Sequence, residues 1–181
     1  AFSSRHGSCL AFGDYHEMLE DSNATIDVVY IATPMKYHYA IIKDCLLAGK
    51  NVLCEKPITS SIEQFQELVQ LAKNKNCFLM EGMWMKCLPT FRKAVEWIKE
   101  GKIGTVDLVK VDFYKKQKIN PELTIHNINE GGGVLQDYGI YAISFMTTFL
   151  QGIPESLQFS NRMSTFGIDS DWNIQAKNKN I

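Results

Sequence analysis

Apolar runs alternate with amphipathic helical patterns along the first half of the chain. Three runs have the length and composition of buried strands: residues 27–32, 51–54 and 77–80. A helical pattern at residues 36–48 ends at Gly49, and another opens with Ser60 and Glu63 in capping-box spacing. Continuous apolar strands separated by helices are typical of a parallel sheet that helices cover on both faces. The pattern therefore predicts an α/β fold with a parallel sheet.

The pattern changes after residue 80 and predicts a second domain. Pro89 suits the first turn of a helix that ends at Gly101. The remaining elements that the pattern predicts are a half-solvated strand at 108–114, a helix at 134–150 and a strand at 156–161. The residues after Gln175 do not resemble a continuing strand. We therefore expect a first domain over residues 1–83 and a second over residues 84–181.

The composition is that of a globular protein and argues against several classes of function. A formal net charge of −1, with 22% charged residues, gives no electrostatic footprint for nucleic acid, and the basic run at residues 115–118 is typical of a solvated loop. No apolar stretch approaches the roughly 20 residues that span a membrane. The five cysteines form no CxxC pair, so we expect neither a disulfide framework nor a metal site. A reducing, cytoplasmic compartment is expected.

Two segments carry polar residues directly after predicted strands, where ligands of a parallel α/β sheet bind. The residues concerned are Thr33, Pro34, His38, Glu55 and Lys56. Pro57 fixes its own φ and pushes Lys56 into extended backbone, so Lys56 should project over the crevice. One alternative is a surface ion pair of Glu55 with Lys56, worth about 0 to 1 kcal/mol. The other is a His38 that lies in the first turn of a helix and bonds to solvent.

A third group of polar residues follows three consecutive glycines. Asp137 and Tyr141 lie one turn apart on one face of the predicted helix, so a carboxylate and a phenol could meet one substrate hydroxyl. Gly139 between them costs helix stability but lets a ligand or another backbone approach closely. Alternatively, Tyr141 is a core aromatic residue and Asp137 is an N-cap.

These motifs occur in a recognisable order. They are ATPxxxH at residues 32–38, CEKP at 54–57, FLMEGMW at 78–84 and GGGxLxDxGxY at 131–141. The order resembles that of the Gfo/Idh/MocA family of oxidoreductases, and within it the dimeric dihydrodiol dehydrogenases, also described as NADP-dependent D-xylose dehydrogenases. The resemblance extends over residues 12–175. It implies a partial Rossmann domain over residues 1–83, followed over residues 84–181 by part of an α/β domain with an open, mainly antiparallel sheet.

The resemblance also implies roles for single residues. The cofactor-binding residues would be Thr33, Pro34, His38, Glu55 and Lys56, the substrate-binding residues Trp84, Asp137 and Tyr141, and the catalytic residues Tyr141, Lys56 and Asp137. The cofactor would be NADP or NAD, the substrate a trans-dihydrodiol or an aldose, and the full-length protein a homodimer. The alternatives are another sugar oxidoreductase of the family and a non-catalytic NAD(P)-binding sensor or scaffold.

The implied roles agree with the chemistry of alcohol oxidation. Removing a hydride from an alcohol carbon also requires the hydroxyl proton to leave, so the reaction needs a positioned base. Tyr141 can serve if its pKa falls from about 10 toward neutrality. Lys56 is the nearby cation that we expect to lower it. Asp137 would orient the hydroxyl or the lysine.

The chain departs from the family pattern in three places. No GxGxxG occurs, and the family's first strand and phosphate-binding turn have no counterpart, so the strand at residues 27–32 should have a bare edge. Most of the second domain's open sheet has no counterpart either. We therefore expect a fragment that is inactive by itself. Lys86 stands where relatives usually have arginine, and a lysine lacks the planar fork for a bidentate contact.

Overall fold

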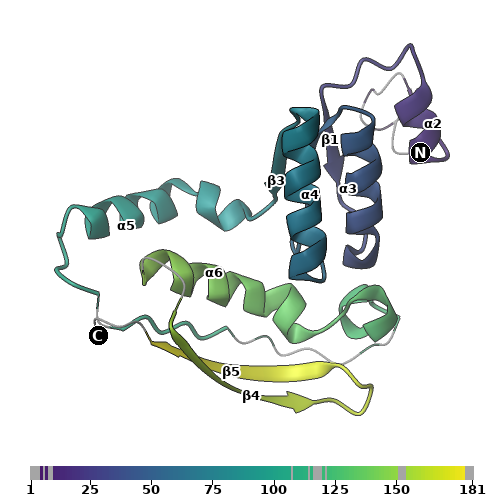
Figure 1. The fold of residues 1–181 in the computed structure, drawn as a ribbon. Coiled ribbons are helices and arrows are strands. Elements are labelled where there is room, and N and C mark those ends of the chain that lie inside the picture. Colours follow the sequence, from purple (N-terminus) through teal and green to yellow (C-terminus); the bar gives the residue numbers. More distant parts are fainter. Residues whose placement is uncertain are drawn as a thin grey trace.

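The computed structural model describes residues 5, 7, 10–106, 108–113, 115, 120, 122–150 and 154–177. Within these residues the fold contains two sheets, which lie in different parts of the molecule (Figure 1). A parallel sheet has the strand order β1-β2-β3, and an antiparallel sheet pairs β4 with β5. The predicted α/β class, with a parallel sheet followed by antiparallel strands, is confirmed.

The parallel sheet consists of the three strands that the apolar runs predict. The strands are β1 (Val28–Ile31), β2 (Asn51–Cys54) and β3 (Leu79–Glu81). Val52 of β2 stands opposite Val29 of β1 and Leu79 of β3. β1 lies at the edge of the sheet, and its outer side has no strand partner among the described residues. The sequence predicts this bare edge.

Two helices, α3 (His38–Leu47) and α4 (Ile62–Lys75), lie side by side over one face of this sheet (Figure 1). The core between them holds Ile31, Ile42, Cys45, Leu46, Val52, Cys54, Ile58, Leu68 and Ala72. Burying one such leucine or isoleucine contributes about 1.5–3 kcal/mol. The prediction of helices on both faces is wrong for the described residues, because Tyr30 and Met80 on the opposite face are 57% and 38% exposed.

The starts of these helices differ slightly from the prediction. A short 3₁₀ turn, η1 (Met35–Tyr37), precedes α3, and Gly49 follows it at φ +72° as expected for a helix end. The N-cap of α4 is one residue later than predicted, because the Ser61 side chain accepts from the backbone N–H of Gln64. Either serine has the chemistry of a cap, and the choice depends on where the chain leaves its extended conformation. Before the sheet, α2 (Tyr15–Glu20) contacts α3 through a hydrogen bond from Tyr15.

In the second half of the chain, α6 (Ile140–Phe149) lies over the antiparallel sheet (Figure 1). The helical elements are η2 (Trp84–Cys87), α5 (Pro89–Lys99), η3 (Thr124–His126), η4 (Ile128–Glu130), the π-helix η5 (Leu135–Gly139) and α6 (Ile140–Phe149). Pro89 takes the first position of α5, as predicted. Phe91 of α5 packs on Phe145 and Phe149 of α6, with ring centroids 5.7 and 5.3 Å away.

The antiparallel strands differ from the prediction at three points. The predicted strand at 156–161 is β4 (Ser156–Met163), and its partner is β5 (Asp169–Lys177), which the pattern missed. The expectation that no strand continues after Gln175 is wrong, because Ala176 pairs with Leu157. Residues 108–113 form no strand in the described part of the chain, and part of this segment lines a cavity together with residues of β5. Alternation produces a strand only where a ladder partner is within reach.

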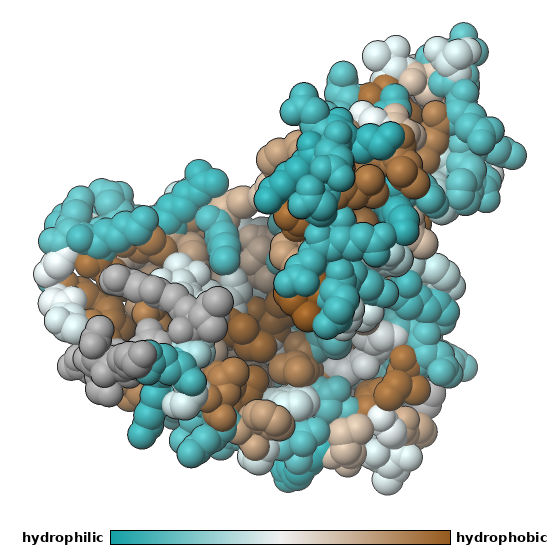
Figure 2. Space-filling model, viewed as in Figure 1, coloured by the Kyte–Doolittle hydropathy of each residue, from teal (hydrophilic) through white to brown (hydrophobic). Residues whose placement is uncertain are grey.

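The single helix predicted at 134–150 begins with the π-helical turn η5 and becomes α-helical from Ile140. On the face shown in Figure 2, hydrophobic side chains lie around the recess between the two parts of the molecule. Over the residues that the structure describes, no helix combines the length and apolar character needed to cross a membrane.

Candidate active site

The segments that follow β1 and β2 meet at one end of the parallel sheet. The backbone N–H of Glu55 donates to the carbonyl oxygen of Ile31 at 2.9 Å and holds the two segments side by side. The Glu55 carboxylate accepts a 2.5 Å hydrogen bond from the Tyr30 hydroxyl, and this bond raises the pKa of Tyr30. The Glu55 carboxylate therefore binds Tyr30 of the neighbouring strand, and the alternative of a surface ion pair between Glu55 and Lys56 is wrong.

Lys56 reaches across to the second part of the chain. Its Nζ donates to Asp137 Oδ1 at 2.5 Å and to the Asp137 main-chain oxygen at 2.7 Å. The Lys56 side chain is 12% exposed and that of Asp137 is 35% exposed. A charge-assisted hydrogen bond that is partly shielded from water is stronger than a surface ion pair. The structure therefore brings together two residues that lie 81 positions apart.

Tyr141 lies on the same side of the helix as Asp137. Lys56 Nζ is 5.0 Å from the centroid of the Tyr141 ring. The indole Nε1 of Trp84 donates to the Tyr141 hydroxyl at 2.8 Å, and the two rings meet edge to face. The structure thus places an amine, a carboxylate, a phenol and an indole N–H from three segments within one small region.

Asp137 is not the N-cap of this helix, so that alternative is wrong. Asp169 of β5 takes the capping role, because its Oδ2 accepts from the backbone N–H of Leu135 at 2.7 Å. Gly133 sits at φ +147°, and a Cβ there would overlap the Asp169 carboxylate. The cap therefore requires glycine at this position. Asp137 itself lies inside the π-helical turn, a conformation that is frequent at functional sites.

His38 is the first residue of α3, as the alternative reading expects, but it does not bond to solvent. It is 1% exposed. Nε2 lies 2.8 Å from the carbonyl oxygen of Thr33, and Nδ1 lies 2.7 Å from that of Pro57. His38 thus joins the segment after β1 to the segment after β2. Thr33 is exposed and Pro34 is half-buried beside it.

Sequence reasoning missed two carboxylates in this region. Glu81, the last residue of β3, accepts a 3.0 Å hydrogen bond from the backbone N–H of Ile58. Glu130 accepts a 2.5 Å bond from Lys36 and ties η4 to η1. Glu81 lies within the motif at residues 78–84, and Glu130 directly precedes the motif at 131–141. The identity of a single residue does not indicate which distant residue it contacts.

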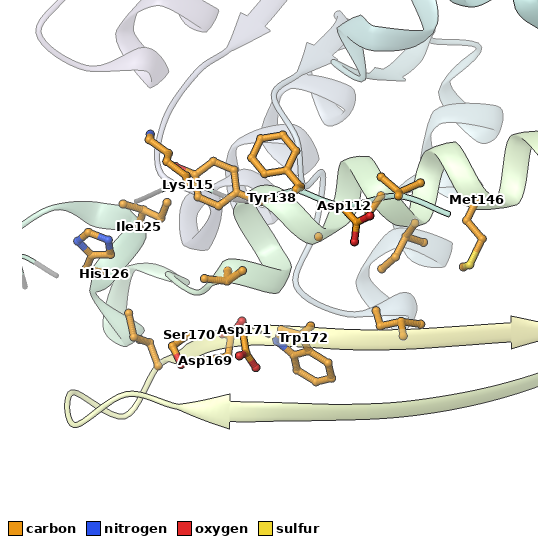
Figure 3. A pocket seen from close by; sticks show the side chains of 18 of the residues that line it. Asp112, Lys115, Ile125, His126, Tyr138, Met146, Asp169, Ser170, Asp171 and Trp172 are labelled. Carbon is orange, nitrogen blue, oxygen red and sulfur yellow. Dashed lines mark hydrogen bonds between the residues drawn. The ribbon is translucent and has the colours of Figure 1, made fainter. Parts of the chain in front are cut away.

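Two hollows accompany the site. One, of about 360 Å³, is lined by Tyr30, Leu53, Glu55, Met80, Gly82, Met83, Trp84 and Cys87 and adjoins the residues described above. The other, of about 380 Å³, lies between α6, β5 and the 108–115 segment (Figure 3). Tyr138 and Lys115 meet at this second cavity through a 2.8 Å hydrogen bond. None of the predicted site residues lines it, so it is separate from the Lys56 region.

The strand-end residues fit the nicotinamide end of a dinucleotide. An apolar hollow beside Glu55 suits a flat ring, and Thr33, Pro34 and Lys56 stand at the carboxyl ends of parallel strands, where such ligands bind. For the diphosphate, by contrast, the 181 residues contain no GxGxxG motif. Within the described residues, no group of three or more His, Cys, Asp or Glu side chains could hold a metal ion.

Comparison with known proteins gives the same picture over both halves. A protein from Xenopus tropicalis named trans-1,2-dihydrobenzene-1,2-diol dehydrogenase is 32% identical over 179 residues, which are 96% of this chain and 52% of that protein. The human protein of the same name is 31% identical over 169 residues, which are 93% of this chain and 49% of that protein. The chain therefore spans about half the length of the curated relatives it matches.

Solved structures share the fold. The aldose-aldose oxidoreductase from Caulobacter crescentus superposes with a TM-score of 0.80 at 18% identity, over 97% of this chain and 54% of that one. GenD2 of gentamicin A biosynthesis, solved in complex with NAD, superposes with a TM-score of 0.77 at 22% identity, over 95% of this chain and 49% of that one.

Residues 3–83 match the oxidoreductase family with an NAD-binding Rossmann fold, and residues 91–177 match the Gfo/Idh/MocA C-terminal domain. The chain belongs to the Gfo/Idh/MocA family of NAD(P)-binding oxidoreductases.

Proposed function

We propose that the protein transfers a hydride between NADP or NAD and the CH–OH group of a trans-dihydrodiol or an aldose, as a cytoplasmic enzyme. The observation that carries the proposal is the cluster in which the Lys56 amine binds Asp137 and lies 5.0 Å from the Tyr141 ring. The names of the 31–33% identical relatives support the diol. The wider family, which includes an aldose oxidoreductase of the same fold, supports the sugar.

Lys56 holds the substrate oxygen in this proposal. An ammonium has three N–H donors, and two of them bind Asp137 in the structure. The third is available to a substrate hydroxyl. Asp137 fixes the amine from both its side chain and its main chain, so the donor keeps one direction.

Tyr141 exchanges the proton with the substrate hydroxyl. The Trp84 N–H donates to the Tyr141 oxygen at 2.8 Å and stabilises negative charge that develops there during proton transfer. Lys56 was expected to act on this oxygen directly, whereas in the structure its amine lies against the ring. When bound, the nicotinamide supplies or accepts the hydride. Glu55, Thr33 and Pro34 would hold its ring and ribose.

The hollow beside the cluster suits a ring-shaped substrate or the cofactor ring. Its lining is almost entirely apolar, and Trp84 forms one wall. A cyclic diol presents one apolar face and two hydroxyls, which matches an apolar wall next to an amine and a phenol. A homodimer of the full-length protein is part of the proposal by family resemblance.

The test is turnover by the protein expressed from its complete open reading frame. Reduction of NADP⁺ and of NAD⁺ is followed at the nicotinamide absorbance with trans-1,2-dihydrobenzene-1,2-diol, D-xylose and D-glucose. We expect turnover of the diol or of an aldose with at least one of the two cofactors. Tight binding of NADPH without turnover of any substrate in a broad carbonyl and alcohol panel would instead support a non-catalytic sensor.

A further inference from the structure

One peptide group next to Lys56 is held at both of its polar ends. It joins Pro57 to Ile58. Its carbonyl oxygen lies 2.7 Å from Nδ1 of His38, and its N–H donates to Oε1 of Glu81 at 3.0 Å. His38 is the first residue of α3, which follows β1, and Glu81 is the last residue of β3. Their side chains therefore bind the segment after β2 from both neighbouring strands.

Burial and further hydrogen bonds hold this peptide group in place. His38 is 1% exposed and Ile58 is 8% exposed, so neither contact competes freely with water. The second ring nitrogen of His38 lies 2.8 Å from the carbonyl oxygen of Thr33. A neutral imidazole donates to one of these carbonyls and a protonated one donates to both. On the other side, the N–H of Gly82 donates to the carbonyl oxygen of Cys54 at 2.6 Å and fixes the chain directly after Glu81.

The geometry points to a role in aiming Lys56. A peptide group is planar, with its C=O and N–H on opposite sides, so holding both ends fixes the rotation of the whole plane. The ring of Pro57 fixes φ on the Lys56 side of that plane. We propose that Glu81 and His38 are positioning residues that direct the Lys56 amine toward Asp137 and the substrate oxygen. The proposal rests on the proposed function and deepens it.

Glu81 provides the cleaner test, because its bond can be kept or removed with little change of shape. Glu81→Gln keeps a side-chain oxygen for the Ile58 N–H, whereas Glu81→Met removes the acceptor. Misplacement of a reacting group by about 1 Å costs up to about 100-fold in rate. We expect Glu81→Met to lower kcat about 10- to 100-fold with the cofactor KM within about 2-fold, and Glu81→Gln to stay close to the wild-type kcat.

A second measurement reports on Lys56 without turnover. Lysines of the protein expressed from its complete open reading frame are ¹³C-methylated, and the Lys56 resonance is assigned by its loss in Lys56→Arg. We expect this resonance to move in Glu81→Met and to stay in place in Glu81→Gln. Glu67→Met is the matched control, because Glu67 binds Lys43 and Tyr39 on the α3–α4 surface. It should change neither kcat nor the resonance.

The outcomes separate the two proposals. An unchanged kcat and an unmoved Lys56 resonance in Glu81→Met overturn the positioning role. Equal losses of kcat in Glu81→Met and Glu67→Met overturn it as well. If the wild-type protein turns over no substrate, the proposed function fails, and the resonance alone decides the positioning role. If Glu81→Met does not fold, Glu81→Asp replaces it, since this variant keeps the charge and withdraws the oxygen by one methylene. A wild-type kcat and resonance in Glu81→Asp then overturn the proposal.

Discussion

Replacing Asp137 by asparagine removes the charge that faces Lys56 and keeps the shape of the side chain. The asparagine oxygen can still accept the 2.5 Å hydrogen bond from the Lys56 side chain, which is 12% exposed, but it carries no negative charge. The 2.7 Å bond to the main-chain oxygen remains. Hydrogen bonds to charged groups are worth about 1.5–3 kcal/mol. A neutral acceptor is worth about 1 kcal/mol less than a charged one, and because Asp137 is 35% exposed, we expect the free energy of unfolding to fall by about 1 kcal/mol.

Urea unfolding of Asp137→Asn, Lys56→Met and the double variant measures this interaction as a coupling free energy. We expect a coupling of about 1 kcal/mol, and a melting temperature about 2–4 °C lower for Asp137→Asn. The Lys93–Glu96 pair of α5 is the matched control, because its 2.6 Å distance is similar but its side chains are 48% and 50% exposed. It should show no measurable coupling. Equal coupling in both pairs would refute the reasoning that burial strengthens the Lys56 contact.

Three further predictions use other contacts. The ion pair of Lys36 with Glu130 ties η1 to η4. Reversing one charge, in Lys36→Glu or in Glu130→Lys, should weaken cofactor binding measured by fluorescence titration, and combining both substitutions should restore it. The hydrogen bond to the Asp14 carboxylate raises the pKa of His16. The stability that His16 adds over His16→Gln should therefore be present at pH 5 and lost as the pH rises through the raised pKa, which urea unfolding at pH 5 and pH 9 measures. Burial raises the pKa of the Cys54 thiol to about 12, so iodoacetamide at pH 8 should alkylate it only after unfolding, as mass spectrometry will show.

Local pattern was sufficient for much of the fold. The run at 51–54 is buried on alternate positions in the centre of the sheet, and its apolar character alone identifies it as a strand. Pro89 marks the start of α5 because a proline is tolerated in the first helical turn and removes a needed donor later. Such signals depend on the residue and its near neighbours, which a sequence displays directly.

Elements that depend on distant partners were harder to predict. The strand at 169–177 is rich in polar residues, and its pairing with β4 supplies the ladder that the pattern does not show. The alternating segment at 108–113 has the right pattern but forms no strand among the described residues. In both cases the deciding factor is a hydrogen-bond partner elsewhere in the chain.

The same limit applies to the site. Motif order led to Lys56, Asp137, Tyr141 and Trp84, and the structure brings these four together. Their detailed contacts were not predictable, because a sequence does not show that Asp137 takes the lysine while Trp84 takes the phenol. His38 was recognised by its motif, yet its burial against two carbonyl oxygens changes what it can do.

The most direct test of the central claim is the turnover of Tyr141→Phe beside that of Tyr138→Phe in the protein expressed from its complete open reading frame. The two tyrosines are neighbours on one helix, but Tyr138 faces the other cavity and its hydroxyl binds Lys115. General acid–base catalysis contributes about 10²- to 10⁴-fold, so Tyr141→Phe should lower kcat by that factor with cofactor affinity nearly unchanged. Tyr138→Phe should stay close to wild type. Equal turnover in the two variants would remove Tyr141 from proton transfer and contradict the account.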